Sequence, residues 1–232
     1  MRQPAAGRRP VTEGARLAAP VRSLALADPV ILALPRGGVP VAFEVAVELG
    51  AALDVMVARK MAVPEQPERG IGAVAEGGAC VVDPGAVTGL GLAPGDVDEL
   101  ARLAGDEVER RVRRYRGERP LPEVAGRPVV LIDDGLATGV TAEAALRSLR
   151  ARAPGRLVLA VPVAARPSLE RMEAVADDIV CLLVPDDFTA VGAWYENFRQ
   201  TSDDEVLRLL AAAAAAGPVS SGGSEPARHR PA

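Results

Sequence analysis

Residues 129–141 read VVLIDDGLATGVT, and this stretch decides the fold because it joins an apolar strand to the start of a helix. The aliphatic run 129–132 is typical of a parallel strand buried on both faces. Further on, apolar residues recur with the spacing of one helix face at Ala142, Ala145, Leu146 and Leu149. The loop between the strand and the helix therefore lies at the carboxyl end of a strand.

The loop between these elements carries groups that suit a phosphorylated sugar. Backbone N–H groups at a helix N-terminus, together with the hydroxyls of Thr138 and Thr141, can bind a phosphate dianion that the helix dipole also favours. Gly135 and Gly139 let a ligand approach the backbone closely. The sequence therefore predicts a phosphate cradle here.

Two acids, Asp133 and Asp134, come immediately before the cradle. Carboxylates in this place can accept hydrogen bonds from vicinal ribose hydroxyls or hold a divalent cation. An acidic pair after a strand is by itself more often a capped turn, so the prediction depends on the whole pattern in residues 129–141.

The rest of the chain alternates strands and helices. Apolar runs predict strands at 30–34, 54–58, 157–161 and 179–184. Helical spacing predicts helices at 13–17, from Val41 to Gly50, at 96–116, after Pro167 and at 202–216. Between 60 and 94 the chain is rich in Gly and Pro and predicts a loop or hairpin, with short strands at 73–75 and 80–82. We expect an α/β fold with a doubly wound, mostly parallel sheet and a site beyond the strands' carboxyl ends.

A second glycine loop, LPRGGVP at residues 34–40, follows the first predicted strand. The amides of Gly37 and Gly38 could cradle another anion, and the forked donors of Arg36 suit pyrophosphate. The same residues equally suit a tight turn between a strand and a helix, so both interpretations stay open.

Lys60 is the only lysine in a chain with 27 Lys and Arg residues in total. Its place at a predicted strand end makes it a candidate contact to pyrophosphate, although a lysine left by chance explains it equally well. The segment 61–78 that follows is rich in Gly and Pro, which suits the hinges of a lid that excludes water.

Composition limits the function further. The net charge is −4 and only six residues are aromatic, so we expect no polymeric nucleic acid as a partner. No apolar run is long enough to span a membrane and no signal peptide is evident, which favours a cytoplasmic protein. We assign residues 1–217 to a single domain and residues 218–232 to a disordered tail.

The rare residues exclude common mechanisms. The only histidine, His229, lies in the predicted tail, so a Ser-His-Asp or Cys-His mechanism has no base. Cys80 and Cys181 are far apart in apolar, strand-like runs and are predicted to be buried free thiols.

The pattern in residues 129–141, an apolar strand, two acids and a small-residue loop ending in Thr-Gly-x-Thr, resembles the phosphoribosyl pyrophosphate (PRPP) signature of type I phosphoribosyltransferases. From 30 to 205 the chain looks like the phosphoribosyltransferase-domain proteins of bacteria whose acceptor is unassigned. The resemblance implies that Asp133 and Asp134 hold the ribose hydroxyls and Mg²⁺. It assigns the 5′-phosphate to Ala137, Thr138, Gly139, Val140 and Thr141, and makes Gly135 a further substrate-binding residue.

The same resemblance implies further parts of the site. Arg36, Gly37, Gly38 and Lys60 would bind pyrophosphate, with a cis peptide near Arg36–Gly37 and a mobile catalytic loop after Lys60. A small hood region would supply a flat wall for the acceptor, and the aromatic-rich segment 188–198 makes Phe188 and Trp194 the candidates.

The activity implied is Mg²⁺-dependent transfer of the phosphoribosyl group from PRPP to a nitrogen acceptor, a nucleobase or related heterocycle, with release of pyrophosphate. A homodimer is left open. In 6-oxopurine transferases an acid stands at the position of Ala137 and a lysine at that of Val140, and their absence argues against hypoxanthine or guanine. Two alternatives are a PRPP- or nucleotide-binding regulator without catalysis and a flavodoxin-type protein that binds another phosphate.

Overall fold

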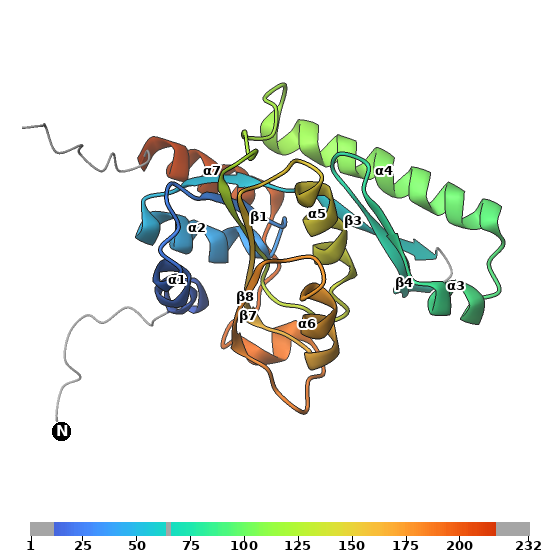
Figure 1. Ribbon diagram of the computed structural model, residues 1–232. Coiled ribbons are helices and arrows are strands. Elements are labelled where there is room, and N and C mark those ends of the chain that lie inside the picture. The colour runs from blue at the N-terminus through green and yellow to red at the C-terminus, as the bar shows by residue number, and fades with distance from the viewer. Residues whose placement is uncertain (1–11, 64–65, 217–232) are drawn as a thin grey trace, which may run out of the picture.

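A five-stranded, all-parallel sheet forms the centre of the protein in a computed structural model that describes residues 12–63 and 66–216 (Figure 1). The predicted tail at 218–232 lies outside the described residues. The strand order is β2-β1-β6-β7-β8. The strands are β1 (Val30–Ala33), β2 (Ala52–Val55), β6 (Pro128–Ile132), β7 (Arg156–Val163) and β8 (Asp178–Leu183). The predicted doubly wound α/β class is confirmed.

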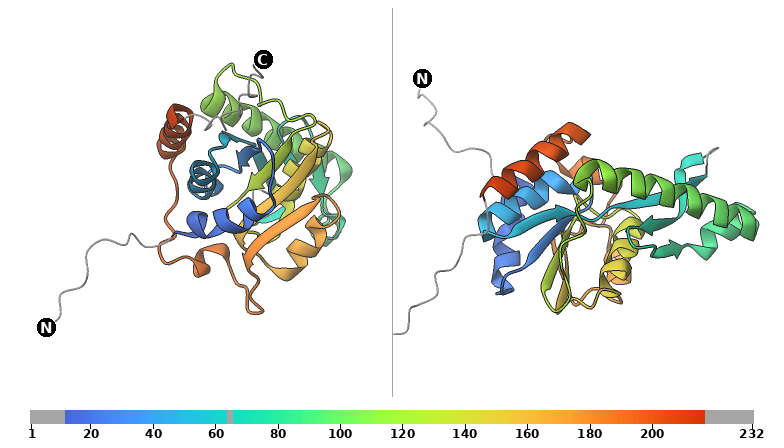
Figure 2. Two further views of the ribbon diagram at one scale, coloured as in Figure 1. Left: turned by 60° about the vertical axis from the view of Figure 1, so that its left-hand side comes forward. Right: turned by 90° about the horizontal axis from the view of Figure 1, so that it is seen from above.

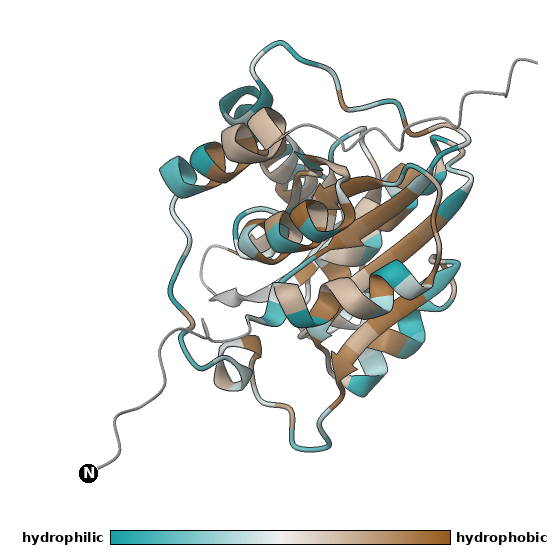
Figure 3. Ribbon diagram, turned by 90° about the vertical axis from the view of Figure 1, so that its left-hand side faces the viewer, coloured by the Kyte–Doolittle hydropathy of each residue, from teal (hydrophilic) through white to brown (hydrophobic). Residues whose placement is uncertain are grey.

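Helices cover both faces of this sheet (Figure 2). One face packs against α1 (Glu13–Ser23), α2 (Gly38–Leu49) and α7 (Asp203–Ala216), and the other against α5 (Val140–Arg150) and α6 (Arg166–Met172). Strand side chains alternate between these two cores: Leu131 faces α5, whereas Ile132 faces α2. Burial on both faces explains the continuous apolar runs, which Figure 3 shows as brown strands between helices with hydrophilic outer surfaces.

A second, antiparallel sheet extends from the central one and is covered by the long helix α4 (Figure 1). It contains β3 (Ala58–Val63), β4 (Gln66–Ala75) and β5 (Cys80–Val82), followed by α3 (Pro84–Gly89) and α4 (Pro94–Arg116). The hairpin expected between 60 and 94 is therefore present, although β4 is much longer than the predicted strand at 73–75 and α3 was not predicted.

The strand predicted at 54–58 is wrong, because the chain changes sheets inside it. β2 pairs with β1 as far as Val55, and the amide of Met56 still donates to Ala33 O at 2.9 Å. From Ala58 the chain pairs with β4 instead. The side chains on both sides of this junction are buried, one set by each sheet, so the apolar run continues through it. Hydrophobicity alone could not reveal where β2 ends and β3 begins.

One of the glycines in the predicted hinge segment has a packing role in this hairpin. Gly72 lies inside β4, where a Cβ would collide with Val81 O and the side chain of Met61. Close approach of the neighbouring strands accounts for glycine at this position.

A buried ion pair ties the hairpin to the central sheet. Arg116, with a side chain only 1% exposed, donates to Val55 O at 2.9 Å and pairs with Glu76. Ser148 of α5 donates to the backbone carbonyl of Glu76. Burial raises the pKa of the neighbouring Asp54.

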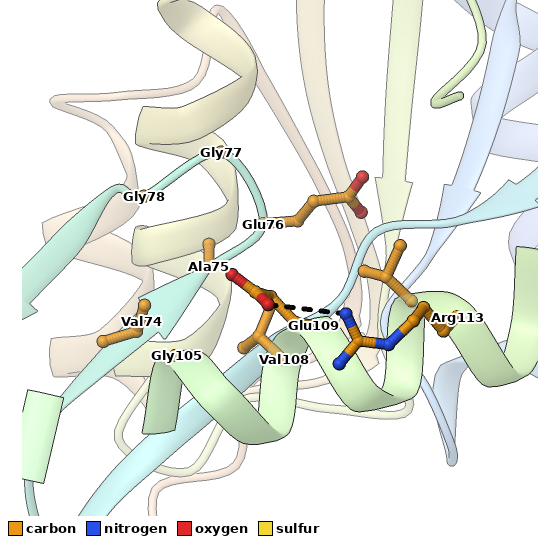
Figure 4. A pocket seen from close by; sticks show the side chains of 10 residues that line it. Val74, Ala75, Glu76, Gly77, Gly78, Gly105, Val108, Glu109 and Arg113 are labelled. Atoms are coloured by element: carbon orange, nitrogen blue, oxygen red, sulfur yellow. Dashed lines mark ion pairs between the residues drawn. The ribbon is translucent and has the colours of Figure 1, made fainter. Parts of the chain in front are cut away.

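Beside this junction, the turn of the hairpin and α4 enclose a pocket of about 260 Å³ (Figure 4). Its rim carries the exposed ion pair between Glu109 and Arg113, at 3.5 Å. Neither acid of the 133–134 pair lines it, so it is separate from the candidate site.

Both cysteines are free, as predicted, but neither is fully buried. Cys80 is exposed and Cys181 is half-buried, because each lies on an edge strand, β5 or β8. Partial burial raises the pKa of both thiols. Among the residues described, no helix combines the length and the apolar character that crossing a membrane requires.

Candidate active site

The two glycine loops lie side by side because β1 and β6 are neighbours in register. Ala33 pairs with Ile132, so both strands end at the same level. A Cβ on Gly37 would collide with the carboxylate of Asp134, and one on Gly38 would lie 2.6 Å from Ile132 O. Only glycine lets the loop after β1 approach the acid pair so closely.

The loop after β1 contains a cis peptide at Pro35–Arg36, one bond before the predicted position. The amide of Gly38 donates to Leu34 O at 3.1 Å, so in this conformation that amide is already engaged. The guanidinium of Arg36 lies 3.7 Å from Asp203, at the start of α7. Arg36 is therefore directed toward α7 and does not line the pockets beside the acid pair.

Asp203 also links Arg36 to α4. Its Oδ1 accepts a hydrogen bond from Tyr115 Oη at 2.6 Å, and its Oδ2 lies 3.0 Å from Arg114. Burial, followed by this hydrogen bond, raises the pKa of Tyr115 to about 12. These contacts fix where the loop after β1 meets the two helices.

The acid pair is half-buried at the end of β6. Asp133 Oδ1 accepts a hydrogen bond from the amide of Asp134 at 2.9 Å. Burial raises the pKa of Asp133 well above its ordinary value, the charge of Asp134 raises it further, and Lys60 lowers it. Burial also raises the pKa of Asp134. Two carboxylates crowded in this way are poised to accept a cation or hydroxyl donors.

Lys60, Asp133 and the loop after β6 meet in one pocket of about 200 Å³. Asp134 lines a different pocket, together with Gly37. Lys60 enters it from β3, Asp133 from the end of β6 and Val191 from the segment after β8. The remaining lining residues belong to the predicted phosphate cradle: Gly135, Leu136, Ala137, Thr138, Gly139, Thr141 and Ala142. The structure thus brings Lys60 next to Asp133 and the predicted cradle, which lie far from it in the sequence.

The backbone of this loop turns into α5 at a glycine. Gly139 adopts a left-handed conformation, φ 71°, which favours glycine, and no side chain caps the N-terminus of α5 that follows. Val140, the first residue of α5, is buried. A Cβ on Gly135 would collide with Val163 and Val191.

The aromatic-rich segment contacts the acid pair through a different pair of rings from the one expected. Tyr195 Oη donates to the backbone carbonyl of Asp134 at 2.5 Å, and its ring lies 5.2 Å from that of Phe198. Burial raises the pKa of Tyr195. Trp194 instead faces a separate pocket of about 110 Å³ beside α1, and Phe188 is half-buried away from both.

The domain profile of the phosphoribosyl transferase family matches residues 8–197. The chain belongs to the phosphoribosyltransferase domain family. Two Mycobacterium tuberculosis proteins, from strains CDC 1551 and H37Rv and provisionally named phosphoribosyl transferases, are 46% identical to it over 197 residues. That alignment covers 85% of this chain and 44% of each relative, so the chain spans less than half the length of these relatives. A crystal structure of a Thermus thermophilus protein, 45% identical, superposes with a TM-score of 0.71 over 85% of this chain and 94% of that one.

The phosphoribosyltransferase domain also has residues at the acid pair that sequence reasoning missed. A pocket of about 160 Å³ brings Asp134 and Gly37 together with Asn197 and Arg199. Arg199 pairs with Glu205 at 2.6 Å. Aromatic density pointed to this segment, but its irregular backbone has no periodicity from which to predict which side chains face the site.

A metal ion in this domain would have to share its ligands with a substrate. Within the described residues, no three His, Cys, Asp or Glu side chains are grouped so that they could hold a metal. Mg²⁺ usually takes one or two protein carboxylates and completes its coordination with water and substrate phosphates. Asp133 and Asp134 fit that requirement.

Proposed function

We propose that this protein is a Mg²⁺-dependent transferase that moves the phosphoribosyl group of PRPP to a nitrogen atom of a small acceptor and releases pyrophosphate. The observation that carries the proposal is the single pocket in which Lys60, Asp133, residues 135–139 and residues 141–142 meet. It combines a cation, the first acid of the pair and a helix N-terminus, which are the groups needed for pyrophosphate, ribose and phosphate.

The sugar phosphate lies along β6 and α5 in this proposal. Asp133 and Asp134 accept hydrogen bonds from the ribose hydroxyls and supply the protein ligands of Mg²⁺, directly or through water. Residues 137–141 bind the 5′-phosphate through backbone amides and the hydroxyls of Thr138 and Thr141. The loop lies at the carboxyl edge of the sheet, where ligands bind in doubly wound folds.

Pyrophosphate leaves toward the loop after β1. Gly37 touches the acid pair there, and its glycine neighbour Gly38 keeps the backbone close. Lys60 adds a positive charge from β3 of the antiparallel sheet. Arg36 can join once it releases Asp203, because that ion pair is long, 3.7 Å, and partly exposed.

The chemistry requires positioning and charge stabilisation rather than a protein nucleophile. As the bond between the sugar and pyrophosphate breaks, positive charge develops on the ribose ring, while the lone pair of the acceptor nitrogen forms the new bond. The half-buried carboxylates of Asp133 and Asp134 lie where they stabilise that charge. Mg²⁺, when bound, neutralises charge on the pyrophosphate oxygens.

We assign the acceptor to residues 188–198. The paired rings of Tyr195 and Phe198 give a flat apolar wall beside Asp134, suited to a nucleobase or related heterocycle. Phe188 and Trp194, expected from the sequence for this wall, do not line the pocket beside Asp134.

Calorimetry with PRPP and Mg²⁺, followed by a nucleobase screen for PRPP-dependent pyrophosphate release, tests the proposal. We expect saturable binding that weakens when EDTA removes the metal, and turnover with at least one acceptor. Absence of PRPP binding would refute the proposal. Binding without turnover or PRPP hydrolysis would instead identify a PRPP-binding regulator.

A further inference from the structure

Three consecutive carbonyl groups of the phosphate loop, those of residues 136–138, are held from one side. The amide of Ala165 donates to Leu136 O at 2.9 Å. Ser168 Oγ donates to Ala137 O at 2.5 Å, and Arg171 Nη1 donates to Thr138 O at 3.1 Å. Ser168 and Arg171 belong to α6, which packs so closely that a Cβ on Gly139 would lie 3.3 Å from Ser168 Cβ.

Peptide planarity converts these contacts into the orientation of the amides. In a trans peptide the C=O and the following N–H point in opposite directions. Fixing the carbonyls of residues 136–138 toward α6 therefore turns the N–H groups of residues 137–139 away from α6. No residue of α6 lines the pocket that contains Lys60 and Asp133.

The amides on that side have no other partner. Among the described residues, no protein oxygen accepts a hydrogen bond from the backbone N–H groups of residues 137–142. Unpaired donors of this kind, next to a helix N-terminus, are the groups that bind an anion.

Arg171 also balances charge at the loop. Its Nη2 lies 2.5 Å from Glu143 Oε2, in the first turn of α5, and Arg147 pairs with the other oxygen of this buried carboxylate at 2.9 Å. Without these guanidinium groups, Glu143 would place an uncompensated negative charge beside the cradle. In the part of the chain that the structure describes, Arg147 donates hydrogen bonds to Glu143 but to none of the loop carbonyls, which makes it a matched control.

We infer that Ser168 and Arg171 are positioning residues, which hold the phosphate loop with its amides turned toward the 5′-phosphate before the substrate arrives. The inference rests on the proposed function, because it requires a phosphate ester at this loop. Preorganised donors bind an anion more tightly since the loop loses no freedom on binding.

Calorimetric titration with ribose 5-phosphate tests this role in the full chain. Ser168→Ala and Arg171→Ala should each weaken binding about threefold to tenfold, the size expected for loss of one hydrogen bond. Arg171→Lys should restore part of the affinity. Arg166→Ala, on the same helix but paired only with Asp186 across 3.6 Å at the surface, should bind as the parent protein does.

Two readouts separate positioning from other effects. Melting temperatures of the ligand-free variants should stay close to that of the parent protein for Arg171→Ala, whose side chain is 44% exposed. If Arg147→Ala weakens binding as much as Arg171→Ala, charge at Glu143 and not carbonyl anchoring is responsible, and the inference is overturned.

Failure of this inference can be distinguished from failure of the proposed function. Unchanged affinity in both Ser168→Ala and Arg171→Ala, with a parent protein that binds ribose 5-phosphate, overturns the inference and leaves the proposed function in place. A parent protein that binds neither ribose 5-phosphate nor PRPP overturns both.

Discussion

Neutralising the acid pair should affect PRPP binding more strongly than folding. In the double variant Asp133→Asn with Asp134→Asn, each amide loses the charged hydrogen bond that its carboxylate would accept from a ribose hydroxyl. Hydrogen bonds to charged groups contribute about 1.5–3 kcal/mol each. Losing both should weaken PRPP binding by about 3–6 kcal/mol, on the order of 10²–10⁴ in Kd.

The fold should tolerate this change. Burial raises the pKa of both acids, so their charged forms are unfavourable in the folded chain, and neutral amides of the same shape relieve that cost. Calorimetry with PRPP and Mg²⁺ measures the affinity, and circular dichroism verifies folding. Asp98→Asn with Asp106→Asn, on the exposed surface of α4, is the matched change in charge. Unchanged PRPP affinity in a folded Asp133 and Asp134 double variant would refute the assignment.

Three further predictions concern single side chains. Asp133→Asn should raise the melting temperature at pH 7, because the pKa of Asp133 is raised in the folded chain. The contribution of the Asp133 carboxyl to stability is therefore fully present below its ordinary pKa of 3.8 and is lost as the pH rises through the folded pKa. Calorimetric melts should show this gain vanish in acid, and an equal gain at every pH would contradict the cause. Lys60→Ala should weaken PRPP binding about 10-fold to 100-fold, as expected for a lost charged contact, and an unchanged Kd would remove Lys60 from the site. Arg116→Met should lower the free energy of unfolding by about 3–5 kcal/mol, since it leaves Glu76 buried without its partner. Urea denaturation measures this loss, and an effect no larger than that of Arg113→Met, an exposed site on the same helix, would contradict it.

Most of the central sheet could be predicted from sequence because its inner strands β1, β6 and β7 are buried on both faces. Continuous apolar runs identified β1, β6, β7 and β8. The start of the hairpin was harder to predict, because the chain crosses from one sheet to the other between Val55 and Ala58 without any change in hydrophobicity.

The chemistry of the site was predictable where it is local and not where it depends on tertiary contacts. Asp133, Asp134 and the loop after them form one continuous motif, so the sequence showed them together. The direction of Arg36 depends on Asp203, 167 positions away in the chain. Ser168 and Arg171 act on backbone carbonyls, which no side-chain pattern can reveal.

A crystal structure of the protein with PRPP and Mg²⁺ tests the central claim most directly. We predict the 5′-phosphate within hydrogen-bond distance of the amides of residues 137–141, with the ribose hydroxyls on Asp133 and Asp134 and pyrophosphate between Gly37 and Lys60. PRPP bound in any other pocket, or with its 5′-phosphate away from this loop, would contradict the account.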